Sequence, residues 1–148
     1  MLAVFFSVVF LFLNPLPRLQ DARNSRRWND VASYINAIKL YQFDNGGHYF
    51  DALNGLKSDL HYQIGEGGGC NVACLHPDVV LQEKCVDFGA LVDSGYLPAI
   101  IIDPKGQASD KTKTEYYVVK SSSGALTIGS CSEEQGTNPS VPDISITR

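Results

Sequence analysis

The first thirteen residues constrain the fold most, because Ser7 is the one polar residue among them. A helix of this length rises about 20 Å, short of the ~30 Å hydrocarbon core of a bilayer. The run also lacks the basic start and the small-residue cleavage site of a secretory signal peptide. A core helix would carry a polar face, and this run has none. We therefore expect lipid or other copies of the chain to cover these side chains: Val4, Phe5, Phe6, Val8, Val9, Phe10, Leu11, Phe12 and Leu13.

Two prolines, Pro15 and Pro17, follow the apolar run. Each lacks a backbone N–H and would clash with the carbonyl four residues earlier in a continuing helix. Leu16, which precedes Pro17, is also disfavoured in the α region. These residues predict that the apolar rod is unwound or kinked near residues 11–17.

An amphipathic helix is predicted beyond the prolines, roughly over residues 19–44. Apolar residues recur there at steps of three and four, which places them on one helix face. This face is expected to pack against a globular head, with two tyrosines, Tyr34 and Tyr41, at its margin. The packing residues are Trp28, Val31, Ala32, Ile35 and Ile38. Asn45, Gly46 and Gly47 then provide the left-handed stop typical of a helix C-terminus.

Charge is distributed unevenly along the chain. Residues 1–27 carry a net charge of +3, whereas residues 28–148 carry −7. The acidic part disfavours nucleic acid as a partner. Four arginines carry the positive charge: Arg18, Arg23, Arg26 and Arg27. They would suit phosphate of lipid headgroups or DNA cargo, but we favour ion pairs with acidic residues of neighbouring subunits.

Four cysteines, Cys70, Cys74, Cys85 and Cys131, follow the apolar segment in a small domain. That setting favours disulfides in an oxidising compartment, although arginines after an apolar run would place the domain in the cytoplasm. Of the three connectivities we favour Cys70 with Cys74 and Cys85 with Cys131, since the second pair ties the last strands to the middle of the chain. The alternative is a zinc site formed by Cys70, Cys74, His76 and Cys85, but its spacing matches no standard motif.

The rest of the chain predicts a mixed α/β head with an irregular beginning. Residues 48–84 show no sustained period and are interpreted as a connecting region pinned by cysteines. A short helix is predicted over about residues 81–93, with Cys85, Phe88, Leu91 and Val92 inward and Gly95 at its end. Residues 114–120 and 125–131 alternate as a β-hairpin, and residues 141–147 are predicted as an edge strand.

No set of residues predicts catalysis. His48, His61 and His76 have no partner spacing that indicates a nucleophile, and we interpret them as surface histidines. The glycines of residues 65–69 lack the lysine of a phosphate-binding loop. Asp103 and Asp110 bracket a polar turn and are the weak candidates for calcium, but turn capping is favoured. We expect neither an enzyme nor a resident cofactor or metal.

Several of these pieces occur in an order that resembles the bacterial type IV pilins and pseudopilins. They are the apolar rod ending in Leu13, Asn14 and Pro15, the stretch 21–31, the helix end 41–47, and residues 95–98, 103–104, 116–118 and 127–129. Some major pseudopilins bind calcium in a loop comparable to the one with Asp103. The family's early glutamate and basic leader are absent, so we expect the leader and about ten residues of the mature helix to precede Met1.

The resemblance implies an α+β pilin fold, with a long bent N-terminal helix packed on a small antiparallel sheet. Residues 1–17 would form the apolar half of the helix, 18–45 its amphipathic half, and 46–148 the globular head. It also implies self-assembly into a helical filament at the cell surface, after residence in the inner membrane. Nucleic acid would bind only as cargo of DNA uptake.

Three functions are open at this point. We favour a structural filament subunit, a pilin, that works by self-association. The second candidate is a pseudopilin of a type II secretion system, built alike but forming a short piston. The third is a membrane-tethered extracellular binding module whose apolar segment is an anchor.

Overall fold

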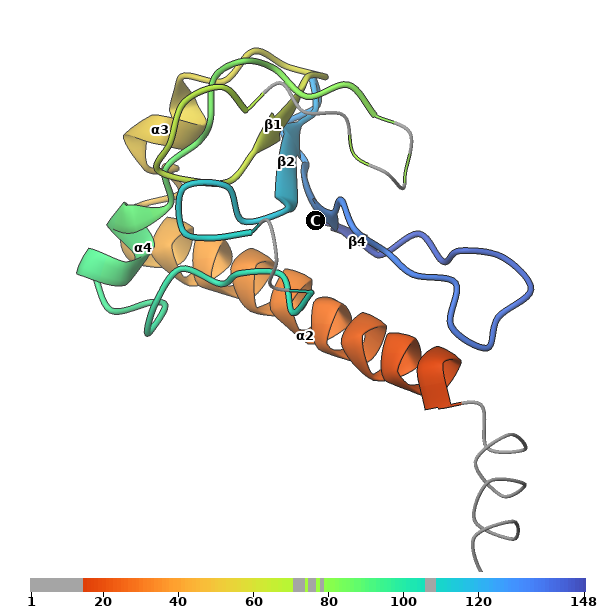
Figure 1. Ribbon diagram of the computed structural model, residues 1–148. Helices are drawn as coiled ribbons and strands as arrows, with labels where there is room; N and C mark the ends of the chain where they lie inside the picture. The colour runs from red at the N-terminus through yellow and green to blue at the C-terminus, as the bar shows by residue number, and fades with distance from the viewer. Residues whose placement is uncertain (1–14, 71–73, 75–76, 78, 106–108) are drawn as a thin grey trace, which may run out of the picture.

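The structure is a computed structural model, and it describes residues 15–70, 74, 77, 79–105 and 109–148. Its largest element is the helix α2, Pro15–Asp44, which lies along the whole head (Figure 1). The helix begins four residues before the predicted start, and both prolines lie in its first turn. Backbone N–H groups of a first turn have no intrahelical acceptor, so proline costs little there. Pro17 therefore does not interrupt α2, and any break before Pro15 lies outside the described residues.

A four-stranded antiparallel sheet packs on α2, in the order β1-β2-β3-β4. The strands are β1 His61–Gln63, β2 Tyr116–Lys120, β3 Leu126–Ser130 and β4 Ser145–Thr147. The predicted hairpin is β2 and β3, with Val118 opposite Ile128. The predicted edge strand is β4, which pairs with β3. The fold is thus α+β, with a long N-terminal helix on a small antiparallel sheet.

The strand β1 and one short helix form within the region predicted to be irregular, residues 48–84. β1 pairs with β2, and α3, Asp51–Asn54, precedes it. The helix predicted over residues 81–93 is wrong in its first part, because Leu81 and Val86 form bridges with β1 and its continuation. Only α4, Gly89–Asp93, is helical there. Backbone pairing to a neighbouring segment outweighed helical propensity at these positions.

The sheet is covered on both faces because its strands alternate. Tyr116 and Val118 face α2 and belong to the main core, in which Tyr34 packs edge-to-face on Phe88 and Tyr116. Tyr117 points to the other face, where Leu81 and two cysteines form a second small cluster. The larger members of the main core are Val31, Tyr34, Ile35, Ile38, Phe50, Leu53, Ile64, Phe88, Leu91, Tyr116, Leu126, Ile128 and Ile144.

The face of α2 that packs on the head is rotated from the predicted one. Val31, Ile35 and Ile38 are buried as expected, but Trp28 is 42% exposed and Ala32 is only partly buried. Tyr34, expected at the margin, is fully buried. The buried face continues toward the N-terminus through two polar residues, Asn24 and Arg27. The apolar pattern therefore predicted the part of this face from Val31 to Ile38 but missed its N-terminal part, which Asn24 and Arg27 form.

Candidate functional site

The apolar segment itself, with the predicted assembly residues from Val4 to Leu13, lies outside the described residues. Within the part of the chain that the structure describes, no helix is both long enough and apolar enough to cross a membrane. A network of ion pairs and hydrogen bonds lies at the junction between the first half of α2 and the head. That junction decides how the helix projects from the head.

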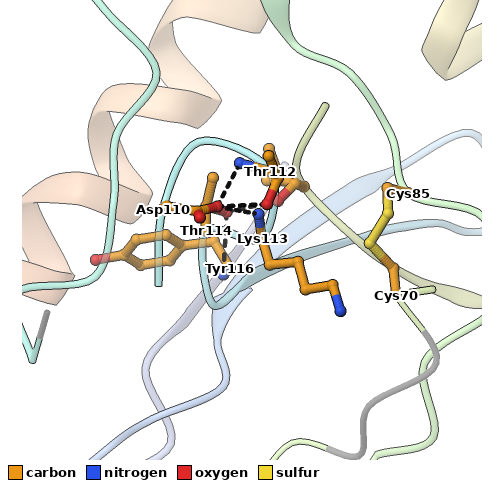
Figure 2. The surroundings of a disulfide bond; sticks show 8 residues. Cys70, Cys85, Asp110, Thr112, Lys113, Thr114 and Tyr116 are labelled. Carbon is orange, nitrogen blue, oxygen red and sulfur yellow. Dashed lines mark hydrogen bonds between the residues drawn. A yellow bond between two sulfur atoms is a disulfide. The ribbon is translucent and has the colours of Figure 1, made fainter. Parts of the chain in front are cut away.

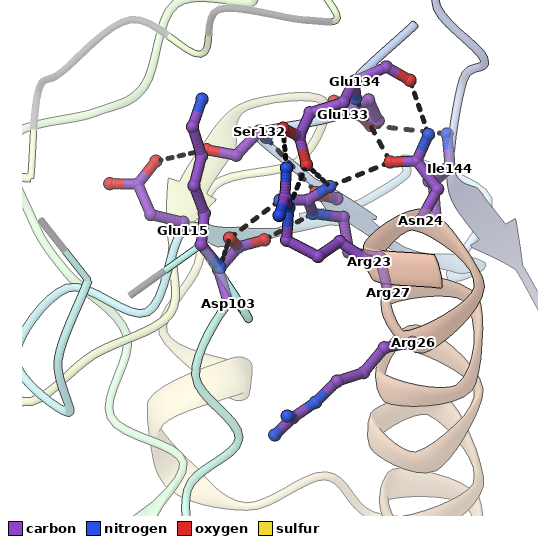
Figure 3. A network of polar contacts seen from close by, with 12 residues as sticks. Arg23, Asn24, Arg26, Arg27, Asp103, Glu115, Ser132, Glu133, Glu134 and Ile144 are labelled. Carbon is purple, nitrogen blue, oxygen red and sulfur yellow. Dashed lines mark hydrogen bonds and ion pairs between the residues drawn. The ribbon is translucent and has the colours of Figure 1, made fainter. Parts of the chain in front are cut away.

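Arg27 occupies the centre of this junction and is fully buried (Figure 3). Its Nε and one terminal nitrogen donate to the two carboxylate oxygens of Asp103 over 2.6 and 2.9 Å. Its other terminal nitrogen donates to Asn24 Oδ1 over 2.8 Å and to Glu134 Oε2 over 3.0 Å. Burial lowers the pKa of Arg27, but the two carboxylates outweigh burial and raise it. Arg27 is therefore a permanently charged connector between three segments.

Arg23 extends the network one turn toward the N-terminus. It donates from Nε and a terminal nitrogen to the two oxygens of Glu134, each over 2.7 Å. The hydrogen bonds from Arg23, together with a smaller effect of the hydrogen bond and charge of Arg27, lower the pKa of Glu134 to about 2. Two arginines thus face two carboxylates, so the network balances its charges. This balance matters because an unpaired buried charge is costly.

Backbone contacts join the same two segments. The side chain of Asn24 donates to the carbonyl of Glu134 and accepts from its N–H. One turn earlier, Asp21 accepts from the N–H and the hydroxyl of Thr137. Gly136 between them has φ +64° and passes so close to the Asp21 carboxylate that a Cβ would collide with it. The stretch 132–137 is therefore fitted closely to α2.

Glu133 lies beside this network without an arginine of its own. One of its oxygens accepts from the N–H of Ile144, and the other is buried with no hydrogen-bond partner among the described residues. Burial raises its pKa to about 8. Glu133 therefore keeps its proton at neutral pH, whereas Glu134 is ionised.

The arginines predicted to pair with neighbouring subunits divide into two groups. For Arg23 and Arg27 the prediction is wrong, because both pair within the chain. Arg18 is exposed, and Arg26 is 64% exposed with a long 3.8 Å contact to Asp30. No sequence pattern identified Asp103 or Glu134 as partners of Arg27, since they follow it by 76 and 107 positions.

Both disulfides differ from the pairing we favoured. The cysteines pair as Cys70 with Cys85 (Figure 2) and Cys74 with Cys131. Cys70 and Cys85 lie on neighbouring extended segments, because the N–H of Cys70 donates to the carbonyl of Glu83. Cys131 follows β3 on the sheet face away from α2, where it meets Cys74. The prediction of disulfides is supported, and the predicted connectivity is wrong.

The remaining candidate residues belong to types that can act as ligands of a metal ion. Among the described residues, no group of three or more histidine, cysteine or acidic side chains could hold a metal ion. His76 lies outside the described residues. Asp103 is engaged by Arg27 rather than open to calcium. Asp110 accepts from the N–H and hydroxyl of Thr112, which lower its pKa, and caps a turn. His48 is exposed and His61 is partly buried in β1.

A long N-terminal helix packed on a small antiparallel sheet is consistent with a pilin-like fold. No family profile, curated protein or solved structure matches the chain in comparisons with known proteins.

Proposed function

We propose that this protein is the structural subunit of a type IV pilus-like surface filament, which assembles through its N-terminal helix and has no catalytic activity. One observation carries the proposal: hydrogen bonds and buried side chains fix α2 to the head from Asp21 onward, while Leu16 and Leu19 in its first turns are more than half exposed. The apolar run of residues 1–13 directly precedes these turns. A helix with one end in a head and an apolar other end suits burial in a shared filament core.

The ionic network supports the same function. A filament subunit must present its head at one angle to the core, since identical contacts repeat along the assembly. The bidentate pairs of Arg27 with Asp103 and of Arg23 with Glu134 restrict that angle, because a planar guanidinium matches a carboxylate in one orientation. An anchor for an independent binding module would need no such restriction.

The experiment compares two valine substitutions in cells that produce the protein. Val9→Asp places a charge in the apolar run and should abolish fibres, because an unpaired charge cannot enter an apolar core. Val80→Asp is the matched control, since Val80 is 75% exposed on the head and should tolerate the charge. Fibres are sheared from the surface, labelled with antibody against the head and counted by negative-stain microscopy. Circular dichroism of both variants checks that the head remains folded.

Two results would contradict the proposal. Labelled fibres that persist in Val9→Asp would show that the apolar run is not the assembly element. Absence of this chain from the fibres of wild-type cells, with the protein present in their membranes, would favour a tethered module instead.

A further inference from the structure

A shallow apolar depression of about 380 Å³ lies on the outside of the head, between α4 and the segment 98–102. Figure 1 shows this segment running beside α2. The floor is formed by Val92, Pro98, Ala99, Ile100 and Ile102. None of the described parts of the protein fills it. Apolar surface of this kind is a candidate contact for another molecule.

The rim of the depression carries an excess of negative charge. Glu66 and Asp93 lie on it with a single lysine, Lys111, which is 3.3 Å from Glu66. Asp93 is exposed at the end of α4 and has no ion-pair partner within 4 Å among the described residues. An occupant that combines apolar side chains with a positive charge would therefore match the depression.

The first turns of α2 have this composition. Leu16 is 59% exposed and Leu19 is 55% exposed, although both belong to a helix with a well-buried face. Arg26, about two turns beyond Leu19 on nearly the same line, is 64% exposed. Its contact with Asp30 is long and solvent-exposed, so it offers little resistance to a new partner.

The two surfaces lie on the same side of α2. Leu16 precedes Tyr34 by eighteen residues, which is five turns, so both share one line along the helix. The Tyr34 hydroxyl hydrogen-bonds the backbone of Ile101 beside the depression. Because each residue rises 1.5 Å, the two surfaces are separated by about 27 Å along the helix axis. A copy shifted by this distance along α2 has its first turns level with the depression, and a rotation of that copy about the helix axis turns Leu16 and Leu19 toward it.

We infer that the depression between α4 and residues 98–102 receives the first turns of α2 from a second copy of this chain, with Leu16 and Leu19 against its floor and Arg26 near Asp93. The inference rests on the proposed filament function and names one of its contacts. The contact joins two different surfaces, so it is heterologous, and it repeats as an open filament when its rotation does not close into a ring. Such contacts build filaments rather than dimers.

Photo-crosslinking tests which molecule occupies the depression. Benzoylphenylalanine replaces Ala99 in the full-length chain, and intact fibres are irradiated and analysed by peptide mass spectrometry. We expect adducts between position 99 and residues 15–26 of a second copy. Adducts to lipid, to another protein or to any other part of the chain would overturn the inference.

Charge exchange provides a second test. Asp93→Lys should lower the amount of fibres at least tenfold, Arg26→Glu should do the same, and the double variant should restore most of them. Asp51→Lys is the matched control, because Asp51 is also an exposed acid, lies on α3 and does not line the depression, so this change should leave assembly unchanged. Absence of rescue in the double variant would contradict the contact. Wild-type fibres are a precondition of both tests, so loss of the proposed function itself would be recognised separately.

Discussion

Replacing Arg27 by methionine should destabilise the head more than any other single change in α2. The substitution leaves the Asp103 carboxylate, with a side chain 1% exposed, without its bidentate partner. Among the described residues, the donor that remains to this carboxylate is the backbone N–H of Lys105. Removing one partner of a buried ion pair costs about 3–5 kcal/mol, out of a total of about 5–15 kcal/mol for a domain. Glu134 contributes little to the loss, because Arg23 still holds both of its oxygens.

The assay is urea unfolding of the full chain in mild non-ionic detergent, followed by far-ultraviolet circular dichroism. Arg23→Met is the matched control: Arg23 is 27% exposed, and Glu134 keeps Arg27, so about 1 kcal/mol should be lost. The double variant Arg27→Met with Asp103→Leu should regain at least about 2 kcal/mol over Arg27→Met. The reason is that an apolar pair of similar volume removes the unpaired charge.

The reasoning would be refuted by either of two results. One is a free energy of unfolding for Arg27→Met within about 1 kcal/mol of the wild type. The other is a double variant no more stable than Arg27→Met, which would mean that lost packing, and not the unpaired buried charge of Asp103, caused the effect.

Three further predictions concern the same region and the disulfides. Since burial raises the pKa of Glu133 from 4.5 to about 8, the folded state holds a proton that the unfolded chain releases. The free energy of unfolding should therefore fall by up to roughly 1.4 kcal/mol per pH unit as pH rises from 4.5 to 8. In Glu133→Gln, the urea midpoint should depend much less on pH across this window. Gly136→Ala should cost more than Gly124→Ala in thermal unfolding, because both have positive φ but only Gly136 approaches another side chain, that of Asp21; equal losses would argue against the close fit. Non-reducing peptide mapping should recover the linked pairs Cys70–Cys85 and Cys74–Cys131, and a Cys70–Cys74 peptide would contradict the pairing described above.

Local patterns predicted the elements that carry the fold. The steps of three and four residues in the helix and the alternation around residues 116–130 each depend on near neighbours in the chain, and α2, β2 and β3 formed where those patterns lie. β1 was missed because three residues are too few to show a period. The predicted helix over residues 81–93 failed in its first part because Leu81 and Val86 pair with distant segments, which no local pattern reports.

The sequence by itself determined that this protein has a long amphipathic helix after an apolar run, a small β-rich head and an oxidised set of cysteines. These properties follow from periodicity and composition. Only the tertiary structure decided that Arg23 and Arg27 pair within the chain, that Trp28 stays partly exposed and which cysteines join. Those outcomes depend on which distant segments meet, because an arginine can form an ion pair equally well with a carboxylate of a neighbouring subunit or of its own chain. The partner it finds is settled by the position of Asp103 and Glu134 against α2.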